Sequence, residues 1–309
     1  MRIVTSYVNP DLDGVACALV YASYIDDSVN PTFVGSPSRE AAGVLERLNL
    51  SGSVGWATES DEVEQTDVVL VDCHHPAQLP HISDFSAVSV IIDHHPDGNA
   101  KAFPNAEIQN ETVGAAATLV AERIIVESGI SKLSPSYAAL LAGAIASNTL
   151  DFSAPSTTER DHKAYLELEN VAEPSVSLVE LRQKMREWRN SFLALSTAEA
   201  VSKDCKLIET PFGVVAVSQL EGDNASAIGD RPGVVDALTE LAAAPEVTAS
   251  LLSLVDTTAN STTLITSDQR IRRALLELHA ESVDSFTLRL PFLALRKTHI
   301  IPAITQAQT

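Results

Sequence analysis

Short apolar runs alternate with segments of helical spacing through the first part of the chain. The runs Arg2–Tyr7, Val68–Val71 and Ser89–Ile92 are bounded by acidic or turn residues, as buried parallel strands are, and Pro31–Gly35 has the same character. Apolar residues at helical spacing predict helices over Gly14–Tyr24, Ser38–Leu48, Val113–Glu127, Pro135–Ser147, Thr158–Glu169 and Ser177–Phe192. Strands that alternate with helices indicate an α/β fold with a doubly wound parallel sheet.

The pattern changes after the polar stretch Arg189–Lys203. The stretch KLIETPFGVVAVSQLE predicts a β-hairpin with its turn at Pro211, Phe212 and Gly213. Next come a helix over Gly233–Ala243, the strands VTASLLSLVDT and STTLITS, a helix over Asp268–Glu281, and a strand-like tail ending in ALRKTHIIPAI. We therefore expect a domain over residues 1–188, a linker and hinge over 189–203, and a smaller α/β domain over 204–309.

Composition narrows the class of protein. The 309 residues are 45% hydrophobic and 20% charged, as in a soluble globular protein with room for two cores. The net charge of −20 argues against nucleic-acid polymers and anionic membranes as partners, because both attract clustered Lys and Arg. Three scattered cysteines indicate neither a disulfide framework nor a zinc knuckle. Because the sequence has neither a signal-peptide pattern nor an apolar run of ~18–20 residues, we expect a cytoplasmic protein.

Ligand-type side chains follow three of the predicted strands. They are Asp11 and Asp13 after the first strand, Asp72, Cys73, His74 and His75 after the second, and Asp93, His94 and His95 after the third. Taken alone, the first pair would also suit the capping of a helix N-terminus. Since the carboxyl ends of parallel strands meet at one edge of the sheet, we expect the three groups to converge there. A mixed carboxylate and imidazole set suits Mn, Co, Fe or Zn, and Asp72 on the central strand is the candidate for bridging two ions.

The order and spacing of these motifs resemble the DHH phosphoesterase superfamily over nearly the whole chain. VIIDHHPDG looks like the signature of that family, NPDLDG like its first motif and VLVDCHH like its second. GAAATLVAERI resembles the helix that follows the DHH strand, and LLAGAIASNTLDFSAPSTTERD resembles the fourth motif, which normally contains Ser-Asp-Thr. The C-terminal unit, with LRKTHIIPAI at its end, is similar to the second (DHHA2-like) domain of the manganese-dependent, family II inorganic pyrophosphatases. In those enzymes a Ser-Arg-Lys-Lys-Gln stretch closes over the substrate.

The resemblance implies an enzyme that hydrolyses inorganic pyrophosphate, or a similar phosphoanhydride, by means of a metal-activated water. The active site would lie in the cleft between the two domains, and the metal would be Mn²⁺ or Co²⁺, with Mg²⁺ as a further option. Alternatives on the same scaffold are an exopolyphosphatase, a nucleotide phosphodiesterase, or a catalytically degenerate protein that binds phosphate or a partner. The pyrophosphatase resemblance also implies a homodimer formed through the first domain.

Site residues follow from the resemblance position by position. The implied metal ligands are Asp11, Asp13, Asp72 and His94, with Asn148 as a weaker one. Catalytic roles would fall to Asp72 and His95. The implied contacts to the substrate phosphate are His95, Lys206, Arg296 and Lys297.

Four departures from the family pattern concern this site. Tyr7 stands where the first motif has a metal-binding His, and Asn148 stands where the fourth has a metal-binding Asp. The second motif reads Asp-Cys-His-His in place of Asp-His-Asn, and the closing stretch has Leu295, Thr298 and His299 in place of Ser, Lys and Gln. A neutral phenol is a poor ligand, and an amide oxygen lacks the charge of a carboxylate. We therefore expect weaker or altered metal binding and uncertain activity, unless compensation comes from His74, His75 or Asp151.

Overall fold

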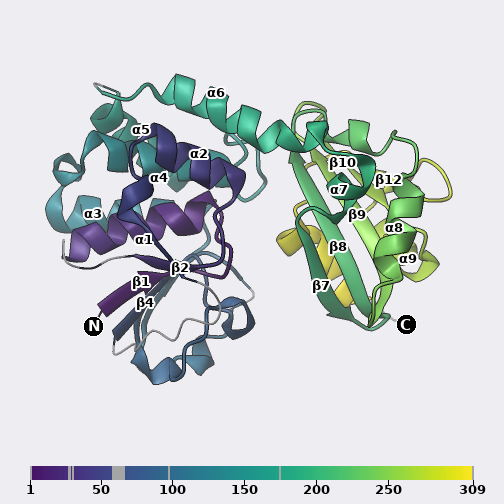
Figure 1. The fold of residues 1–309 in the computed structure, drawn as a ribbon, viewed down its shortest axis with the longest axis horizontal. Coiled ribbons are helices and arrows are strands. Elements are labelled where there is room, and N and C mark those ends of the chain that lie inside the picture. The colour runs from purple at the N-terminus through teal and green to yellow at the C-terminus, as the bar shows by residue number, and fades with distance from the viewer. Residues whose placement is uncertain are drawn as a thin grey trace. The chain divides into compact units, whose positions relative to one another are not determined.

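A computed structural model describes residues 2–26, 29, 31–57, 67–96, 98–173 and 175–307. The chain divides into two compact units, Met1–Trp188 and Arg189–Thr309 (Figure 1). Within the described ranges, no helix combines the length and the apolar character needed to cross a bilayer.

A four-stranded parallel sheet forms the centre of the first unit. Its strands, in spatial order, are β1 (Arg2–Thr5), β4 (Asp67–Val71), β5 (Val88–Asp93) and β6 (Glu107–Asn110). Val69 of β4 pairs in parallel with Val4 of β1 on one side and Val90 of β5 on the other, so the carboxyl ends of these three strands lie at the same edge of the sheet. The predicted strand around Phe33 is present as β2 (Thr32–Val34), but it pairs with β3 (Gly55–Ala57) in a separate two-stranded sheet.

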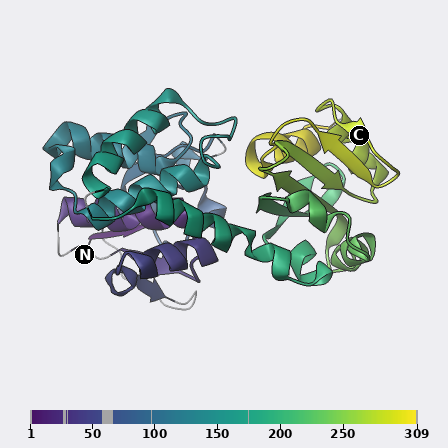
Figure 2. The ribbon, with the colours of Figure 1, turned by 90° about the horizontal axis from the view of Figure 1, so that it is seen from above.

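Helices pack against one face of this sheet, as Figure 1 and the view from above in Figure 2 show. They are α1 (Leu12–Ile25), α2 (Arg39–Arg47), α3 (Ala116–Ser128), α4 (Pro135–Asn148), α5 (Glu159–Ala172) and α6 (Leu178–Arg189). The core on this side joins Val69 and Ile92 to Leu119 and Leu140. On the opposite face, Leu70 and Ile91 pack against residues from short 3-10 turns and loops, including Phe103.

Local signals explain where two of these helices begin. The Ser134 hydroxyl accepts the backbone N–H of Tyr137, and Pro135 occupies the first turn of α4, which begins where the sequence predicts a helix. Asp11 caps α1 in the same way, through the backbone N–H groups of Asp13 and Gly14. Both α1 and α4 are apolar around most of their circumference, which fits their burial: α1 packs between the strands and α4, and α4 packs between α1 and α5.

The second unit has a six-stranded sheet of its own. Its strands are β7 (Cys205–Thr210), β8 (Gly213–Gly222), β9 (Val247–Asp256), β10 (Ser261–Ile265), β11 (Glu281–Ser282) and β12 (Thr287–Leu290), in spatial order β11-β12-β10-β9-β8-β7. All pairs are antiparallel except β8 with β9. The helices are α7 (Thr197–Ser202), α8 (Val234–Ala242), α9 (Gln269–Leu276) and α10 (Ile301–Thr305), and separate apolar cores lie on the two faces of the sheet.

The predicted fold class, α/β with a parallel sheet followed by a second α/β unit, is confirmed. The predicted hairpin is confirmed as well, because Thr210 pairs with Gly213 across a turn at Pro211 and Phe212. The strand-like tail is confirmed in its first part, where β12 lies, and is wrong at its end, where a π-helical turn, Arg296–Ile300, leads directly into α10. Ile300 and Ile304 are four residues apart and enter the same core, so their spacing is helical.

Candidate metal centre

Asp72 lies at the carboxyl end of β4, and two imidazoles from the end of β5 surround its carboxylate. Its Oδ1 atom is 3.3 Å from Nε2 of His94 and 3.7 Å from Nδ1 of His95. Ligand atoms of these three residues all lie within 4.8 Å of one another. Asp72 is buried and has φ +58°, a left-handed conformation that Asp tolerates better than most residues. Three of the residues expected at the sheet edge are therefore together there.

The ring of His94 is held in one tautomer. Its Nδ1 atom is 2.9 Å from the carbonyl oxygen of Val113, so Nδ1 carries the proton and donates it. Nε2, which has the free lone pair when the ring is neutral, faces Asp72 and lies 3.9 Å from Oδ2 of Asp13. This is the arrangement by which proteins orient an imidazole toward a metal.

Asp13 brings buried negative charge to the same place. From α1 it reaches the start of α3, where its Oδ2 and Oδ1 accept the backbone N–H groups of Ala116 (2.8 Å) and Ala117 (2.9 Å). The partial positive charge of a helix N-terminus favours a carboxylate there. Burial nevertheless raises the pKa of Asp13 well above its usual range, and the charge of Asp72 raises it further. The buried carboxylates of Asp13 and Asp72 therefore repel one another, and a cation beside them would offset that repulsion.

Asp93 connects two histidines behind this cluster. Its Oδ1 accepts the Nδ1–H of His95 (2.8 Å) and the backbone N–H of His94 (2.7 Å), while its Oδ2 pairs with Nδ1 of His74. Burial opposes ionisation, but the hydrogen bonds from His74 and His95 prevail and hold the pKa of Asp93 well below its usual range. A Cβ on Gly98 would lie 1.7 Å from Nε2 of His74, so only glycine lets the ring occupy this place.

Asp11 and Tyr7 form the side of the site nearest to α1. Asp11 uses Oδ1 to cap the helix, at 2.9 Å from the N–H of Asp13 and 3.3 Å from that of Gly14. The Tyr7 hydroxyl oxygen accepts the backbone N–H of Asp11 at 3.1 Å. Burial of this hydroxyl raises the pKa of Tyr7 well above its usual value, and the charges of Asp11 and Asp72 add to the effect. Tyr7 is therefore a neutral phenol beside the acids.

Asn148 ends α4 and points its amide group at the same cluster. Nδ2 donates to the carbonyl oxygen of Gly114 (3.0 Å) and to Oδ2 of Asp13 (3.1 Å). It also lies 3.4 Å from Nε2 of His94. The amide nitrogen is the atom of Asn148 that faces the acceptors.

The structure gives the three possible compensating residues other surroundings. His74 is bound to Asp93, and the buried Nδ1 of His75 has no hydrogen-bond partner among the described residues. The Asp151 carboxylate accepts hydrogen bonds from Arg182 (2.7 Å) and Arg186 (2.6 Å) of α6. Asp151 is also the middle one of three consecutive left-handed residues, with φ +50°, +55° and +67° over positions 150–152. None of the three belongs to the group that Asp72 forms with His94 and His95.

In the second unit, the guanidinium of Arg296 is buried against Asp204. One terminal nitrogen donates to the Asp204 carbonyl (2.5 Å) and the other lies 2.9 Å from each carboxylate oxygen of that residue. Lys206 is half-buried on β7, opposite Val217, and Lys297 is half-buried in the π-helical turn.

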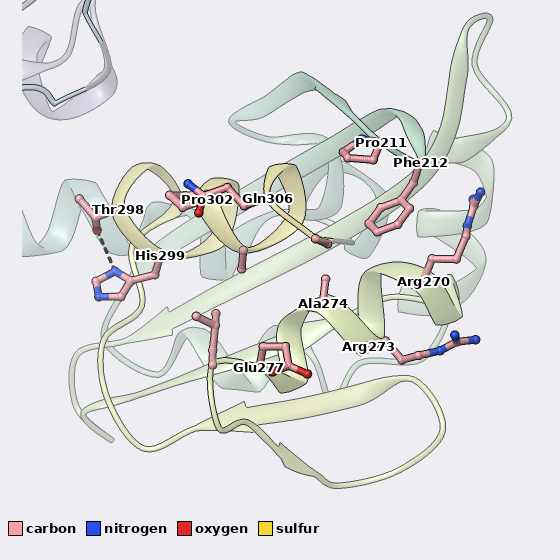
Figure 3. Close-up of a pocket in the computed structure, with 13 residues that line it drawn as sticks. Pro211, Phe212, Arg270, Arg273, Ala274, Glu277, Thr298, His299, Pro302 and Gln306 are labelled. Carbon is pink, nitrogen blue, oxygen red and sulfur yellow. Dashed lines mark hydrogen bonds between the residues drawn. The ribbon is translucent and has the colours of Figure 1, made fainter. Parts of the chain in front are cut away.

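An open pocket of about 950 Å³ lies elsewhere in the second unit, between α9, α10 and the β7–β8 turn (Figure 3). Arg270 and Arg273 lie near Phe212 on one side, and the Thr298 hydroxyl is hydrogen-bonded to the His299 ring on the other. Arg270 is already paired with Asp268 at 2.6 Å, which leaves the lining with little net positive charge.

The donor set of the first unit suits a divalent metal. Two buried carboxylates and one imidazole lone pair converge, and the hydrogen-bond donors to Asp13 are backbone amides, the Asn148 amide and the Cys17 thiol, none of which is charged. Oxygen and imidazole ligands together favour a first-row transition metal.

The sequence does not predict the roles of two residues that hold the ligand-type side chains in place. The sequence places Asp93 in the cluster of ligand-type residues but does not show that it orients His95. Asp161 was not considered, although its buried carboxylate accepts hydrogen bonds from Gly114 N–H (2.9 Å), the Thr118 hydroxyl (2.6 Å), and the backbone and hydroxyl of Thr158. The T-x-x-D spacing from Thr158 to Asp161 is the signature of a capping box and could have found it.

Comparison with known proteins agrees with this geometry. Residues 2–145 match the N-terminal domain of the DHH family. A protein of Deinococcus radiodurans and one of Staphylococcus carnosus, both assigned as manganese-dependent inorganic pyrophosphatases, are 27% and 24% identical, and each alignment covers 98% of both chains. A Methanococcus jannaschii structure assigned to the family II inorganic pyrophosphatases has a TM-score of 0.80 over 99% of both chains, at 22% identity. The predicted resemblance to the DHH proteins and to the family II pyrophosphatases is therefore confirmed.

Proposed function

We propose that this DHH-domain protein is a metal-dependent hydrolase that cleaves inorganic pyrophosphate, or a similar phosphoanhydride, to phosphate. The observation that carries the proposal is the group that Asp72, His94 and His95 form at the edge of the parallel sheet, with Asp13 Oδ2 lying 3.9 Å from His94 Nε2. Relatives assigned to this activity, similar over 98% of both chains, support the choice of substrate.

The metal would be held by Asp13, Asp72 and His94, with Asp11 as a further ligand and Asp72 shared if two ions bind. A bound divalent ion supplies positive charge to phosphoryl oxygens and lowers the pKa of a coordinated water. Mn²⁺ is the metal we favour, with Co²⁺ and Mg²⁺ as alternatives, because the relatives are assigned as manganese-dependent.

The residues of the chain itself bind and orient the substrate. His95 donates its Nδ1 proton to Asp93, which orients the ring, and Nε2 would donate to a phosphate oxygen when the ring carries its second proton. Lys206, Arg296 and Lys297 would neutralise phosphate charge, Arg296 as a bidentate fork and the lysines as point charges. Arg296 must first release Asp204, because the terminal nitrogen that would bind the phosphate is hydrogen-bonded to the Asp204 carboxylate.

Phosphate release from pyrophosphate, tripolyphosphate and a cyclic nucleotide, each with Mn²⁺, Co²⁺ or Mg²⁺, tests the proposal. We expect turnover to be fastest with pyrophosphate and Mn²⁺. A preference for tripolyphosphate or the cyclic nucleotide would indicate the exopolyphosphatase or phosphodiesterase alternative. No turnover with any pairing, together with no metal retained, would indicate the degenerate protein. The cytoplasmic location, the homodimer and the exclusion of nucleic-acid and membrane partners stay predictions.

A further inference from the structure

The side-chain amide of Asn148 makes hydrogen bonds inside the candidate metal centre. Its nitrogen donates to Gly114 O at 3.0 Å and to Asp13 Oδ2 at 3.1 Å, and lies 3.4 Å from His94 Nε2. Two of these three atoms, the carboxylate oxygen and the imidazole nitrogen, are the lone pairs that a metal ion would use.

The partners fix which end of the amide faces the cluster. A carbonyl and a carboxylate can only accept, so the nitrogen has to face them and the amide oxygen has to point away. The adjoining backbone is held in place on both sides: Val113 O accepts from His94, and Gly114 N–H donates to Asp161 at 2.9 Å. Turning the amide around would place its oxygen against two acceptors and leave the Gly114 carbonyl without this donor.

We propose that Asn148 competes with the metal ion for Asp13 and His94 instead of serving as a ligand. The inference rests on the proposed metal site and deepens it. The N–H group offsets part of the repulsion between the buried acids, so the site stays assembled without metal. An incoming cation must displace that group, which weakens metal binding relative to a site where the donor is missing.

The alternative is that Asn148 coordinates the metal through its oxygen. The two roles predict opposite effects of truncating the side chain. If Asn148 competes, Asn148→Ala removes the competitor and metal binding becomes tighter. If Asn148 is a ligand, the same change removes a ligand and binding becomes weaker.

Calorimetric titration of the metal-free full-length protein with Mn²⁺ separates these roles without measuring activity. For N148A we expect binding about two- to tenfold tighter than in the wild type, as the net value of one hydrogen bond implies. We also expect the melting temperature of the metal-free first unit to fall by about 2–4 °C for each kcal/mol lost. Saturation with Mn²⁺ should then raise the melting temperature more in N148A than in the wild type. Equal or weaker binding by N148A would overturn the proposal.

Ser147→Ala is the matched control, because this neighbour on α4 directs its hydroxyl to Glu40 at 2.8 Å and not to Asp13 or His94. S147A should bind Mn²⁺ as the wild type does. Should N148A fail to fold without metal, a crystal structure of the wild type with Mn²⁺ gives the answer. Asn148 Nδ2 should remain on Gly114 O, and a metal–Oδ1 distance of about 2.0–2.4 Å would overturn the inference. If the wild type, S147A and N148D all bind no metal, the proposed metal site itself is overturned. Weaker binding by N148A alone overturns only the role of Asn148.

Discussion

His94 Nε2 lies 3.3 Å from Asp72 Oδ1, although the two residues follow different strands, β5 and β4. Each is fixed from outside the pair: His94 by the Val113 carbonyl, and Asp72 by its backbone N–H, which donates to Ile92 O at 2.8 Å. The pair is therefore set by backbone positions rather than by flexible side chains.

Asp72→Asn should fold but bind Mn²⁺ at least ~100-fold more weakly, because the substitution removes the charge that both imidazoles face. Asn accepts the left-handed backbone at this position, where φ is +58°, so the fold should survive. Calorimetric titration measures the loss. Asp67→Asn is the control, since Asp67 begins the same strand and pairs with Arg2 at 2.6 Å. Similar Mn²⁺ affinity in D72N and the wild type would mean that the site is misplaced.

Asp161→Ala should lower the free energy of unfolding of the first unit by roughly 3 kcal/mol or more, because several buried donors lose their acceptor. The same change should weaken Mn²⁺ binding, since Gly114 lies between the carbonyl that holds His94 and the amides that hold Asp13. Urea denaturation and metal titration give the two values.

Ser134→Ala serves as the control for D161A. It removes the N-cap of α4 and should cost about 1 kcal/mol without affecting metal binding. A D161A protein with normal Mn²⁺ affinity would show that Asp161 is only structural.

Arg296→Ala should destabilise the second unit, because the buried guanidinium supplies donors to Asp204 and to the Val217 carbonyl (3.3 Å). Arg296→Lys keeps the charge but not the fork, so its melting temperature should lie between those of R296A and the wild type. If Arg296 also binds substrate, both variants should raise the KM for pyrophosphate. A melting temperature of R296A equal to that of the wild type would contradict the structural role.

The ionisation of Asp256 should make the free energy of unfolding of the second unit depend on pH. Burial opposes its ionisation, but the Ser226 hydroxyl (2.5 Å) and the backbone N–H groups of Ala259 and Ser226 prevail and lower the pKa of Asp256. Because the pKa of Asp256 is lower in the folded than in the unfolded state, its carboxylate stabilises the fold at pH values above the unfolded pKa of about 3.9. This contribution is lost as the pH falls through the folded pKa.

Asp256→Asn should therefore destabilise the second unit at pH 7 by roughly 2–3 kcal/mol, with a difference that narrows below about pH 4. Urea denaturation of both proteins from pH 3 to pH 7 measures it. Asp236→Asn, at an exposed position of α8, controls for the loss of one negative charge. A difference between D256N and the wild type that stays constant across this range would contradict the assignment.

The elements predicted best are those with local chemical signals. Ser134 and Pro135 define the start of α4, and Pro211 to Gly213 define the hairpin, because capping and turn formation depend on residues close in sequence. β6 was missed because its four residues are all partly or fully exposed and show no apolar alternation. The end of the C-terminal tail is helical and not extended as predicted, because a short apolar run is compatible with a strand or a helix and its periodicity alone does not distinguish them.

The site shows the same division. Asp72 and His94 could be predicted together because the ends of parallel strands meet at one edge. The direction of the Asn148 amide could not, since it depends on the Gly114 carbonyl, thirty-four positions away in sequence. Nor could the sequence tell that Asp93 is shared by His74 and His95, because that contact depends on the glycine at position 98.

The left-handed turn at positions 150–152 begins two residues after Asn148. Left-handed backbone costs roughly 1–2 kcal/mol per non-glycine residue, so the turn persists only while something opposes its relaxation. Arg182 and Arg186 of α6 do so by binding Asp151, and α6 is the last helix before the chain enters the second unit. Two ion pairs and one strained turn thereby connect α6, where the chain leaves the first unit, to Asn148, which donates to Asp13 in the candidate metal centre. A displacement of α6 would therefore shift Asn148 relative to Asp13 and His94 without any change in those two residues.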